Sequence, residues 1–439
     1  MNTLAEVRLW GKTIGAVALQ DRDDVASFEY DAAFAQSGIE VAPIVMPLSR
    51  RVYRFPELSR PTFHGLPGLL ADSLPDKFGN ALIDAWLASQ GRQPDSFNAV
   101  ERLCYTGARG MGALEFAPAI GPTAKQTTHI EVGNLVELAS EVLSNRNNLQ
   151  ASFAAEGKED ALRDILRVGT SAGGARAKAV IAWNPKTNEV RSGQVKADKG
   201  FEYWLLKFDG VTGNKDKELD DPKGYGVIEY AYYLMALECG IDMNECRLFK
   251  ESGRSHFMTR RFDRVIGDGA TGEKLHMQSL SALAHYDFNM AGAYSYEQAF
   301  LVMRQLQLTM QAIEQQFRRM AFNIVARNQD DHVKNIAFLM NKSGEWSLSP
   351  AFDMTDSFNP TGAWTASHQM SMNRKRDHFT LEDFNACAKT ASMKRGRAAK
   401  IVAEVQAAVS QWKSFAEQAG VSDGVREKIQ GVLNLKPYS

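Results

Sequence analysis

Cysteine is scarce in this chain. The 439 residues include only Cys104, Cys239, Cys246 and Cys387, and no two of them form a Cys-x-x-Cys pair. No histidine cluster stands beside them in the sequence, which argues against a structural zinc site. So few cysteines in so long a chain are typical of a reducing cytosol, and we predict a cytoplasmic protein.

Long apolar runs and an excess of basic charge are also missing. No stretch approaches the roughly 18 uncharged apolar residues that a membrane span needs. The N-terminus lacks the basic start and apolar core of a signal peptide. The 51 Lys and Arg residues nearly balance the 52 Asp and Glu residues, for a net charge of −1. A protein that binds nucleic acid through its own charge is usually more basic, so we expect neither a membrane partner nor direct DNA binding.

The length and the residue patterns predict three structural units. At roughly 150 residues per domain, a chain of this length suggests about three compact units. We expect a β-rich N-terminal subdomain at residues 1–125, a lobe with a glycine loop and a small sheet at 126–265, and a mostly helical lobe at 266–439. Strands and helices are segregated in this order, which predicts an α+β fold.

Local patterns place the first elements. Val7–Trp10 and Thr13–Leu19 alternate apolar and polar residues around a Gly-Lys turn, as in a β-hairpin. A helix is expected at Asp76–Leu87. Three glycines within Gly107–Gly112 precede an apolar segment and a proline rather than a helix, so we interpret them as a strand turn and not as a phosphate loop.

The later elements follow an order found in kinases. We expect strands at Ala179–Trp183, Glu189–Lys196, Tyr203–Phe208 and Ser255–Met258. Helical segments are expected at His129–Leu166 and Gly226–Cys239, with amphipathic helices at Tyr296–Asn323 and Ala398–Gly420. A β-hairpin is expected at Ile336–Met340 and Trp346–Leu348. A glycine loop, a small sheet with one helix and a helical body with an inserted hairpin correspond to a kinase N-lobe followed by a C-lobe. The predicted architecture is therefore a kinase-like bilobal fold with an additional N-terminal β-rich subdomain.

The strongest functional signal is the segment Asn328-Gln-Asp-Asp-His-Val-Lys-Asn335. Phosphoryl transfer needs a carboxylate near the attacking hydroxyl and an oxygen ligand for Mg²⁺, and protein kinases place these as Asp and Asn with four residues between them. Asp330 and Asn335 have this spacing. The hairpin that follows sends the chain out and back, so Asp353 can return to the same ion. We predict Asp330 as the catalytic base and Asn335 and Asp353 as Mg²⁺ ligands.

Several alternatives remain open around this segment. Asp331 competes with Asp330 for the role of base, and only the spacing favours Asp330. His332 either orients the catalytic loop or contacts phosphate, or it is a hydrogen-bonded structural histidine. Lys334 either neutralises phosphate charge or is merely exposed. We count His332 among the catalytic candidates and Lys334 among the ATP-binding candidates.

A loop of small residues and a lysine supply further candidates. In the segment from Arg167 to Lys178, small side chains let backbone N–H groups approach phosphate oxygens, although the pattern is neither a Walker motif nor the protein-kinase glycine loop. Lys207 ends an apolar strand at the position that clamps ATP phosphates, and Glu229 on the next helix is its candidate partner. Alternatively, Lys207 is an edge-strand lysine that reaches solvent. We predict ATP contacts at Ser171, Ala172, Gly173, Gly174 and Lys207.

At these motifs the sequence resembles the HipA-like serine/threonine kinases, toxins of bacterial type II toxin–antitoxin modules. The resemblance covers essentially the whole chain in length and order. Its specific parts are Gly65-Leu-Pro-Gly-Leu-Leu-Ala-Asp-Ser-Leu-Pro75, Thr170-Ser-Ala-Gly-Gly-Ala-Arg-Ala-Lys178, Arg261-Phe-Asp-Arg264, Asp330-Asp-His-Val-Lys-Asn335 and Pro350-Ala-Phe-Asp353. Together these motifs are highly specific for the family.

The resemblance implies roles for individual residues. It assigns the role of base to Asp330, the Mg²⁺ ligands to Asn335 and Asp353, and the contact with ATP phosphates to Lys207. The backbone around Arg260, Arg261 and Phe262 would meet adenine as a hinge. Ser171 matches the loop serine that this family autophosphorylates, which ejects the loop and switches the kinase off.

Two positions depart from the family pattern. Family members often have glycine where this chain has Asp331, which changes the charge beside the base. They also often have an acidic residue where Arg260 stands, which leaves the backbone to make the adenine contacts.

The resemblance also implies substrates and partners. The family's typical substrates are protein hydroxyls, including those of aminoacyl-tRNA synthetases, and its antitoxin partner is a small helix-turn-helix protein, through which DNA is contacted indirectly. We therefore predict an ATP- and Mg²⁺-dependent serine/threonine protein kinase that acts as a toxin and phosphorylates a protein substrate and itself. One alternative is a small-molecule or lipid kinase, because such enzymes share the spacing at 330–335. Another is a non-catalytic DNA-repression partner.

Overall fold

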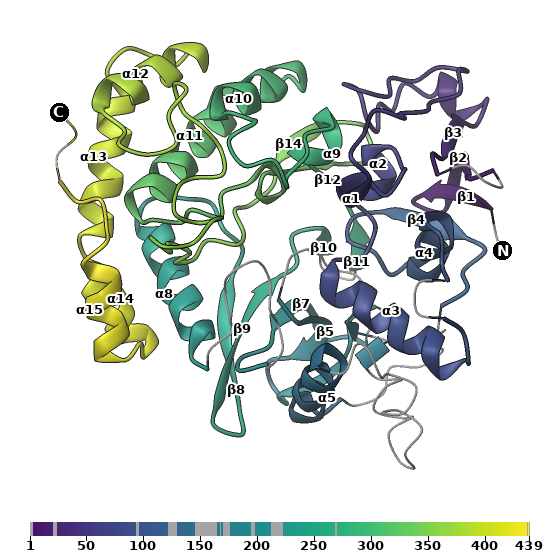
Figure 1. Cartoon of the computed structure of the whole chain (residues 1–439), viewed down its shortest axis with the longest axis horizontal. Helices are drawn as coiled ribbons and strands as arrows, with labels where there is room; N and C mark the ends of the chain where they lie inside the picture. The colour runs from purple at the N-terminus through teal and green to yellow at the C-terminus, as the bar shows by residue number, and fades with distance from the viewer. Residues whose placement is uncertain are drawn as a thin grey trace.

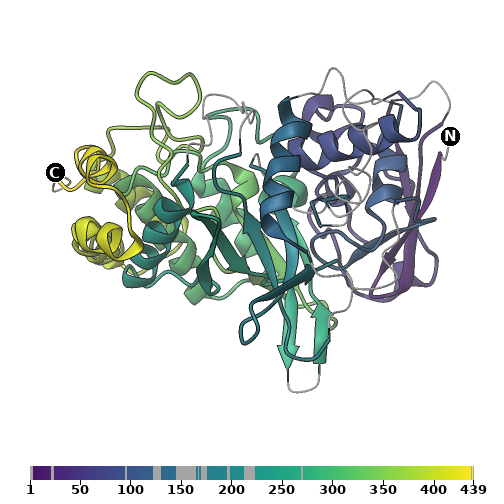
Figure 2. The same cartoon turned by 90° about the horizontal axis from the view of Figure 1, so that it is seen from below.

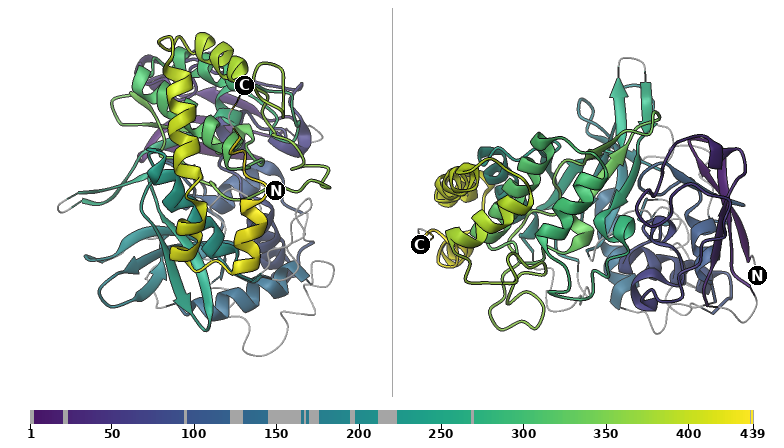
Figure 3. Two further views of the ribbon diagram at one scale, coloured as in Figure 1. Left: turned by 90° about the vertical axis from the view of Figure 1, so that its left-hand side faces the viewer. Right: turned by 90° about the horizontal axis from the view of Figure 1, so that it is seen from above.

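The computed structural model describes residues 3–20, 24–93, 96–121, 130–144, 165–166, 168–169, 176–194, 198–211, 223–267, 270–436 and 438. Figure 1 shows the N-terminal strands at one end of the longest axis and the last helices, from α12 (Leu381–Thr390) to α15 (Asp423–Gln430), at the other. Figure 2 and the right-hand view of Figure 3 show the same separation from below and from above. Three main hydrophobic cores follow one another along this axis. None of the helices in the described part of the chain is long and apolar enough to cross a bilayer.

The N-terminal part is built on a four-stranded antiparallel sheet in the order β3-β2-β1-β4. Its strands are β1 (Leu4–Leu9), β2 (Lys12–Ala18), β3 (Ser27–Tyr30) and β4 (Leu114–Ala117). β1 and β2 form the predicted hairpin, and Gly11 turns it with a φ of +78° that favours glycine. The remaining elements of this part are η1 (Phe34–Gln36), α1 (Arg60–Phe63), α2 (Gly68–Ala71), α3 (Lys77–Ser89) and α4 (Ala99–Thr106).

A second sheet of five antiparallel strands carries the middle of the chain, in the order β6-β5-β7-β9-β8. Its strands are β5 (Lys178–Asn184), β6 (Glu189–Ser192), β7 (Glu202–Lys207), β8 (Cys246–Glu251) and β9 (Arg254–Arg260). Helix α5 (Val132–Ser144) and helix α3 share one core with this sheet, through residues such as Phe78 and Leu82. Helix α8 (Tyr225–Glu238) contacts β8 and β9. Although α3 lies within the first 125 residues, it therefore packs on the second sheet.

The C-terminal part is mostly helical, as predicted, and contains the largest core. Its helices are α9 (Leu280–Ala284), α10 (Tyr296–Gln305), α11 (Met310–Val325), η2 (Val333–Asn335), α12, α13 (Arg397–Val409), α14 (Trp412–Ala419) and α15. The predicted hairpin is confirmed as β13 (Ala337–Met340) and β14 (Trp346–Leu348), and it pairs with β12 (His276–Ser279) in a three-stranded sheet. Strands β10 (Arg264–Gly267) and β11 (Ala270–Lys274) form a separate two-stranded ribbon.

Two long helices predicted from the sequence are broken in the structure. The run at Tyr296–Asn323 is divided after α10, where Gln307 adopts a φ of +58°. The N–H of Leu308 donates to the main-chain oxygen of Met303 and ends α10, and the side chain of Thr309 caps the N-terminus of α11. Such a closing turn ends a helix even where apolar periodicity continues. The run at Ala398–Gly420 is divided into α13, which ends at Val409, and α14, which begins at Trp412.

Other boundaries also differ from the predictions. The helix expected over His129–Leu166 is described as α5 only as far as Ser144, and residues 145–164 lie outside the described part of the chain. The strand expected at Glu189–Lys196 ends at Ser192. The segment Gly107–Gly112 leads directly into β4, which confirms that it is a turn before a strand.

A buried ion cluster joins that turn to the end of the second sheet. The carboxylate of Asp263 accepts hydrogen bonds of 2.8 and 2.7 Å from Arg261, one of 2.7 Å from Arg264 and one of 2.7 Å from the N–H of Gly112. Burial alone would raise the pKa of Asp263, but the two guanidinium groups hold it well below its usual range. The carboxylate therefore stays charged and links the N-terminal part to the sheet.

Replacing Asp263 with Asn keeps the side-chain volume but leaves two buried guanidinium groups without their counter-charge. We expect the free energy of unfolding to fall by about 3–5 kcal/mol, the usual cost of breaking a buried ion pair. Urea denaturation measures this change. Asp198→Asn is the matched control, because Asp198 pairs with Arg191 at the surface with its side chain 75% exposed, and its loss should cost less than about 1 kcal/mol. Equal effects of the two changes would contradict the structural role of the cluster.

Candidate active site

The candidate catalytic loop follows helix α11. The helix ends at Val325, and Arg327 turns the chain with a φ of +58°. The side-chain amide of Asn335 donates a hydrogen bond of 2.9 Å to the main-chain oxygen of Asp330. An amide carries its donors and its acceptor on different atoms, so this bond leaves Oδ1 of Asn335 as the atom that can bind a cation.

Asp330 is the accessible member of the adjacent carboxylates. Its side chain is 41% exposed. Its Oδ1 accepts a hydrogen bond of 2.8 Å from the indole N–H of Trp364, and its main-chain N–H donates to Oγ of Ser357 over 3.0 Å. The carboxylate is thus held by a neutral donor and remains open to solvent.

Asp331 is turned into the protein, with its side chain only 1% exposed. Its oxygens accept hydrogen bonds from the hydroxyl of Tyr296 at 2.6 Å and from the N–H of Gln369 at 2.7 Å, and Nδ1 of His368 lies 2.9 Å away. Burial alone would raise the pKa of Asp331, but His368 and these hydrogen bonds lower it below its ordinary value. The two neighbouring carboxylates, which the sequence could not separate beyond their spacing, therefore occupy opposite environments.

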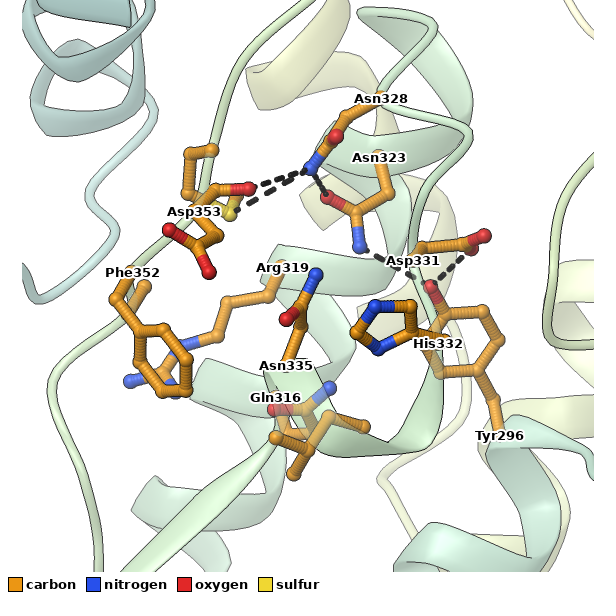
Figure 4. A pocket seen from close by; sticks show the side chains of 13 residues that line it. Tyr296, Gln316, Arg319, Asn323, Asn328, Asp331, His332, Asn335, Phe352 and Asp353 are labelled. Atoms are coloured by element: carbon orange, nitrogen blue, oxygen red, sulfur yellow. Dashed lines mark hydrogen bonds between the residues drawn. The ribbon is translucent and has the colours of Figure 1, made fainter. Parts of the chain in front are cut away.

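The hairpin β13–β14 returns the chain to the catalytic loop. Asp353 follows it and lines the same pocket as Asn335, with both side chains pointing into it (Figure 4). The φ of Asp353 is +53°, in a region that non-glycine residues adopt only where the surroundings hold them. Two contacts hold it here: Asn328 donates to its main-chain oxygen over 3.4 Å, and its carboxylate pairs with Lys207.

The ammonium group of Lys207 lies between two carboxylates. Its Nζ is 2.5 Å from Oε1 of Glu229 on α8 and 2.5 Å from Oδ1 of Asp353. The predicted pair with Glu229 is therefore confirmed, and the alternative of a lysine that reaches solvent is wrong. Burial alone would lower the pKa of Lys207, but the two carboxylates raise it well above its usual range. In turn, against the effect of burial, Lys207 lowers the pKa of Asp353 to about 2.

Asn335 and Asp353 suit Mg²⁺ as part of a larger ligand set. Both offer oxygen atoms, the donors that Mg²⁺ prefers. The described part of the chain contains no group of three or more His, Cys, Asp or Glu side chains that could hold a metal ion on its own. Mg²⁺ is usually bound by one or two carboxylates together with waters and substrate phosphates. The pair therefore fits an ion that arrives with a triphosphate rather than a permanent metal site.

Only parts of the predicted phosphate loop belong to the described residues. Ser171, Ala172, Gly173 and Gly174 lie outside the described residues. The strand that follows them begins at Lys178, which is the cross-strand neighbour of Lys207. Position and register therefore place the end of the loop segment beside the phosphate lysine candidate.

The predicted hinge is only partly free for a ligand. The N–H of Arg260 donates to Glu245, its carbonyl accepts from Asn244, and the N–H of Arg261 donates to Tyr203. These three main-chain groups are already used within the protein. The Arg261 side chain is buried in the ion cluster around Asp263, so the prediction of an adenine contact is left to the carbonyl of Arg261 and the main chain of Phe262.

Phe262, the last hinge residue, contacts a residue that lines the pocket and His332 lines it, whereas Lys334 contacts an aromatic ring. The ring of Phe262 lies 5.6 Å from that of Phe352, which lines the pocket. His332 also lines the pocket, and its Nε2 is 4.0 Å from Oδ1 of Asp330. Nζ of Lys334 lies 5.0 Å from the ring centre of Phe288.

The sequence-based predictions missed two residues of this region. Arg319 lines the pocket, is buried and donates to the main-chain oxygen of Ser349 over 2.7 Å, and burial lowers its pKa to about 10. An arginine on the apolar face of an amphipathic helix is unusual enough to have marked it in advance. Trp364, which contacts Asp330, carries no comparable signal, because its contact depends on the path of a loop.

Two protein-family models match separate parts of the chain. The model of the HipA-like C-terminal domain matches residues 170–412, more than half of the chain, and the model of the HipA N-terminal domain matches residues 5–117. The chain belongs to the HipA-like family. The predicted resemblance is therefore confirmed, and in this HipA-like chain the C-terminal model includes Lys207, Asp330, Asn335 and Asp353.

Solved structures add the fold. A structure of the Shewanella oneidensis MR-1 toxin–antitoxin system HipA, HipB and its operator DNA matches with a TM-score of 0.67 and 15% identity, over 97% of this chain and 94% of that chain. At this identity the match shows a shared fold, and the predicted kinase-like bilobal architecture of α+β class is confirmed. The Helicobacter pylori proinflammatory kinase CtkA matches with a TM-score of 0.33 and 9% identity over 53% of this chain and 88% of its own, too weakly to support an argument. No curated protein matches.

Replacing Asp331 with Asn keeps the shape of the side chain but removes its charge. We expect the free energy of unfolding at neutral pH to fall by about 2–3 kcal/mol, because hydrogen bonds to a buried charged group are lost. The folded pKa of Asp331 lies below the value of about 3.9 in an unfolded chain. Its stabilisation is therefore complete above about pH 5 and is lost as the pH falls through the folded pKa.

Chemical denaturation of the wild type and Asp331→Asn at a series of pH values measures this effect. The difference between the two proteins should be constant near neutral pH and should shrink below about pH 4. A difference that does not change with pH would show that the charge of Asp331 is not the cause.

Proposed function

We propose that this HipA-like chain transfers the γ-phosphoryl group of ATP, in the presence of Mg²⁺, to a serine or threonine hydroxyl of a protein. The observation that carries the proposal is the position of Lys207, which contacts Glu229 and Asp353 at once, while Asp353 shares a pocket with Asn335. Kinases use a strand lysine paired with a helix glutamate, together with a metal-binding Asp and Asn, for this reaction.

Each residue has a defined task in the proposed reaction. Asp330 accepts a hydrogen bond from the substrate hydroxyl, orients it and takes its proton as the oxygen attacks. Lys207, released from Asp353 toward the ligand, binds phosphate oxygens and remains positioned by Glu229. Mg²⁺, when bound by Asn335 and Asp353, neutralises charge on the phosphate oxygens. Most of the rate gain comes from this positioning and from electrostatic stabilisation.

His332 and Lys334 have supporting tasks in the proposal. His332 lines the pocket close to Asp330 and helps to set the orientation of the catalytic loop. Lys334, in the same segment, adds positive charge that favours the triphosphate. The carbonyl of Arg261 and the main chain of Phe262 border the adenine at the hinge, and residues Ser171–Gly174 bind the phosphates.

The biological setting follows from the family. We propose that the chain is the toxin of a toxin–antitoxin module, paired with a small helix-turn-helix antitoxin that brings it to DNA. The structure from Shewanella oneidensis, in which HipA is seen with HipB and operator DNA, supports this setting by analogy. The net charge of −1 agrees with indirect DNA contact. We propose that the same activity phosphorylates Ser171 and thereby limits itself, and that its protein substrates include aminoacyl-tRNA synthetases.

Replacing Asp330 with Asn should lower phosphoryl transfer roughly 10²- to 10⁴-fold, the usual effect of losing a general base. Transfer of ³²P from ATP to the chain itself and to added cell extract measures the rate. Label on protein supports the proposed acceptor class, and label only on small molecules would contradict it. Mass spectrometry of the self-modified protein should find phosphate on Ser171.

Asp423→Asn is the control for this variant. Asp423 is an acidic residue on α15, 89% exposed and paired with Arg426, so its replacement should leave the rate unchanged. Near-normal transfer by Asp330→Asn would remove Asp330 from the role of base.

A further inference from the structure

The segment from Asp353 to Gln369 wraps around the catalytic loop. Near its start, Oγ of Ser357 accepts from the N–H of Asp330 at 3.0 Å and donates to Oδ1 of Asn328 at 3.1 Å. Asn328 in turn donates to the main-chain oxygen of Asp353. The first turn of the segment is therefore fastened to the backbone that carries the proposed base.

The end of the segment is fastened to the neighbouring carboxylate. Asp331 accepts from the N–H of Gln369 and lies 2.9 Å from the ring of His368, and all three side chains are buried. The side-chain amide of Gln369 then donates to the main-chain oxygen of Trp364 at 2.5 Å and to that of Gln329 at 3.3 Å. Gln369 thus connects the buried carboxylate to the backbone on which Trp364 stands.

Between these two fixed ends, Trp364 reaches the proposed base. Its indole N–H donates to Oδ1 of Asp330 over 2.8 Å. The Asp330 side chain keeps 41% of its surface exposed, so a hydroxyl group can still approach it. The segment is therefore shaped so that one carboxylate oxygen is held while the carboxylate stays accessible.

We propose that Trp364 is a positioning residue for phosphoryl transfer, which orients the Asp330 carboxylate toward the attacking hydroxyl, and that Asp331 serves the reaction by anchoring the segment that carries Trp364. This inference rests on the proposed function. It gives Asp331 a task other than that of a base. In this chain the additional carboxylate is not a second base but the attachment point of the positioning segment.

An indole is suited to this task. Its N–H is only a donor and does not titrate in water, so it fixes a carboxylate without delivering a proton to it. A hydrogen bond to a charged oxygen also restricts the torsion angles of an exposed aspartate, whose freedom would otherwise reduce the fraction of productive encounters. The next group along the loop, the His332 ring, is 4.0 Å from the same oxygen, beyond hydrogen-bond distance.

The test replaces Trp364 with Phe, which keeps an aromatic ring and removes the N–H. Single-turnover self-phosphorylation at saturating Mg-ATP should slow roughly 10- to 100-fold, the range set by one hydrogen bond to a charged group. The dissociation constant for Mg-ATP, measured by calorimetry, should change by less than about twofold, because the contact lies at the base and not at the phosphates.

Trp346→Phe is the matched control. Trp346 lies on β14, and its indole also donates to an oxygen. That oxygen is the main-chain carbonyl of Glu40, at 3.1 Å, and does not belong to the catalytic loop. The variant should transfer phosphate at the wild-type rate. An equal loss in both variants would show that the effect of Trp364 is general destabilisation and would overturn the inference.

A double-mutant cycle with Asp330→Asn separates positioning from a merely structural role. If Trp364 acts through Asp330, then Trp364→Phe should cause no further loss when Asp330 is already Asn. The same fold-loss in both backgrounds would overturn the inference, as would faster transfer by Trp364→Phe, which would identify the indole as a block on the base.

If the wild type transfers no phosphate, the proposed function itself fails. If it transfers phosphate and Trp364→Phe is equally fast, only the positioning role fails.

Discussion

A buried ammonium group between two carboxylates holds the two lobes of this protein in register. Lys207 ends a central strand of the five-stranded sheet, Glu229 stands on the helix that packs against that sheet, and Asp353 follows the hairpin of the helical lobe. A charge in this environment is tolerated only where opposite charges surround it, so the three segments must meet. The left-handed backbone of Asp353 is kept because this contact and Asn328 determine its position.

The N-terminal part contributes to the same arrangement. Within one short stretch, Asp72 accepts from the N–H and the hydroxyl of Ser279 beside the helical lobe, and Asp76 lies 3.2 Å from Lys178 on the strand next to Lys207. The cluster around Asp263 adds a third connection, to the end of the same sheet. The N-terminal part therefore contacts both lobes through carboxylates, and its geometry is coupled to that of the candidate active site.

Local chemistry made a large part of this site predictable from the sequence. The spacing of Asp330 and Asn335, the return of Asp353 through a hairpin and the pairing of Lys207 with Glu229 follow from strand, turn and charge patterns that act over short distances. The spacing favoured Asp330 as the base, but the burial of Asp331 could not be predicted, because it depends on His368 and Gln369, which reach the loop from a distant segment. The strand β12 was missed for a similar reason, since it pairs with β13, which lies far along the chain. The strand β8 was missed although it forms a short hairpin with β9, in which Glu251 pairs with Arg254. The break within the predicted helix at Tyr296–Asn323 depends on a single residue in the left-handed region, Gln307, that apolar periodicity does not reveal.

We propose that Asn335, Asp353 and Lys207 together bind a metal-bound triphosphate. Calorimetric titration of ATP into the wild type and into Asp353→Asn, each with and without Mg²⁺, measures the part that Asp353 plays. We expect that Mg²⁺ strengthens ATP binding to the wild type and that this gain disappears in the variant. A gain of the same size in both proteins would contradict the claim that Asp353 binds the metal.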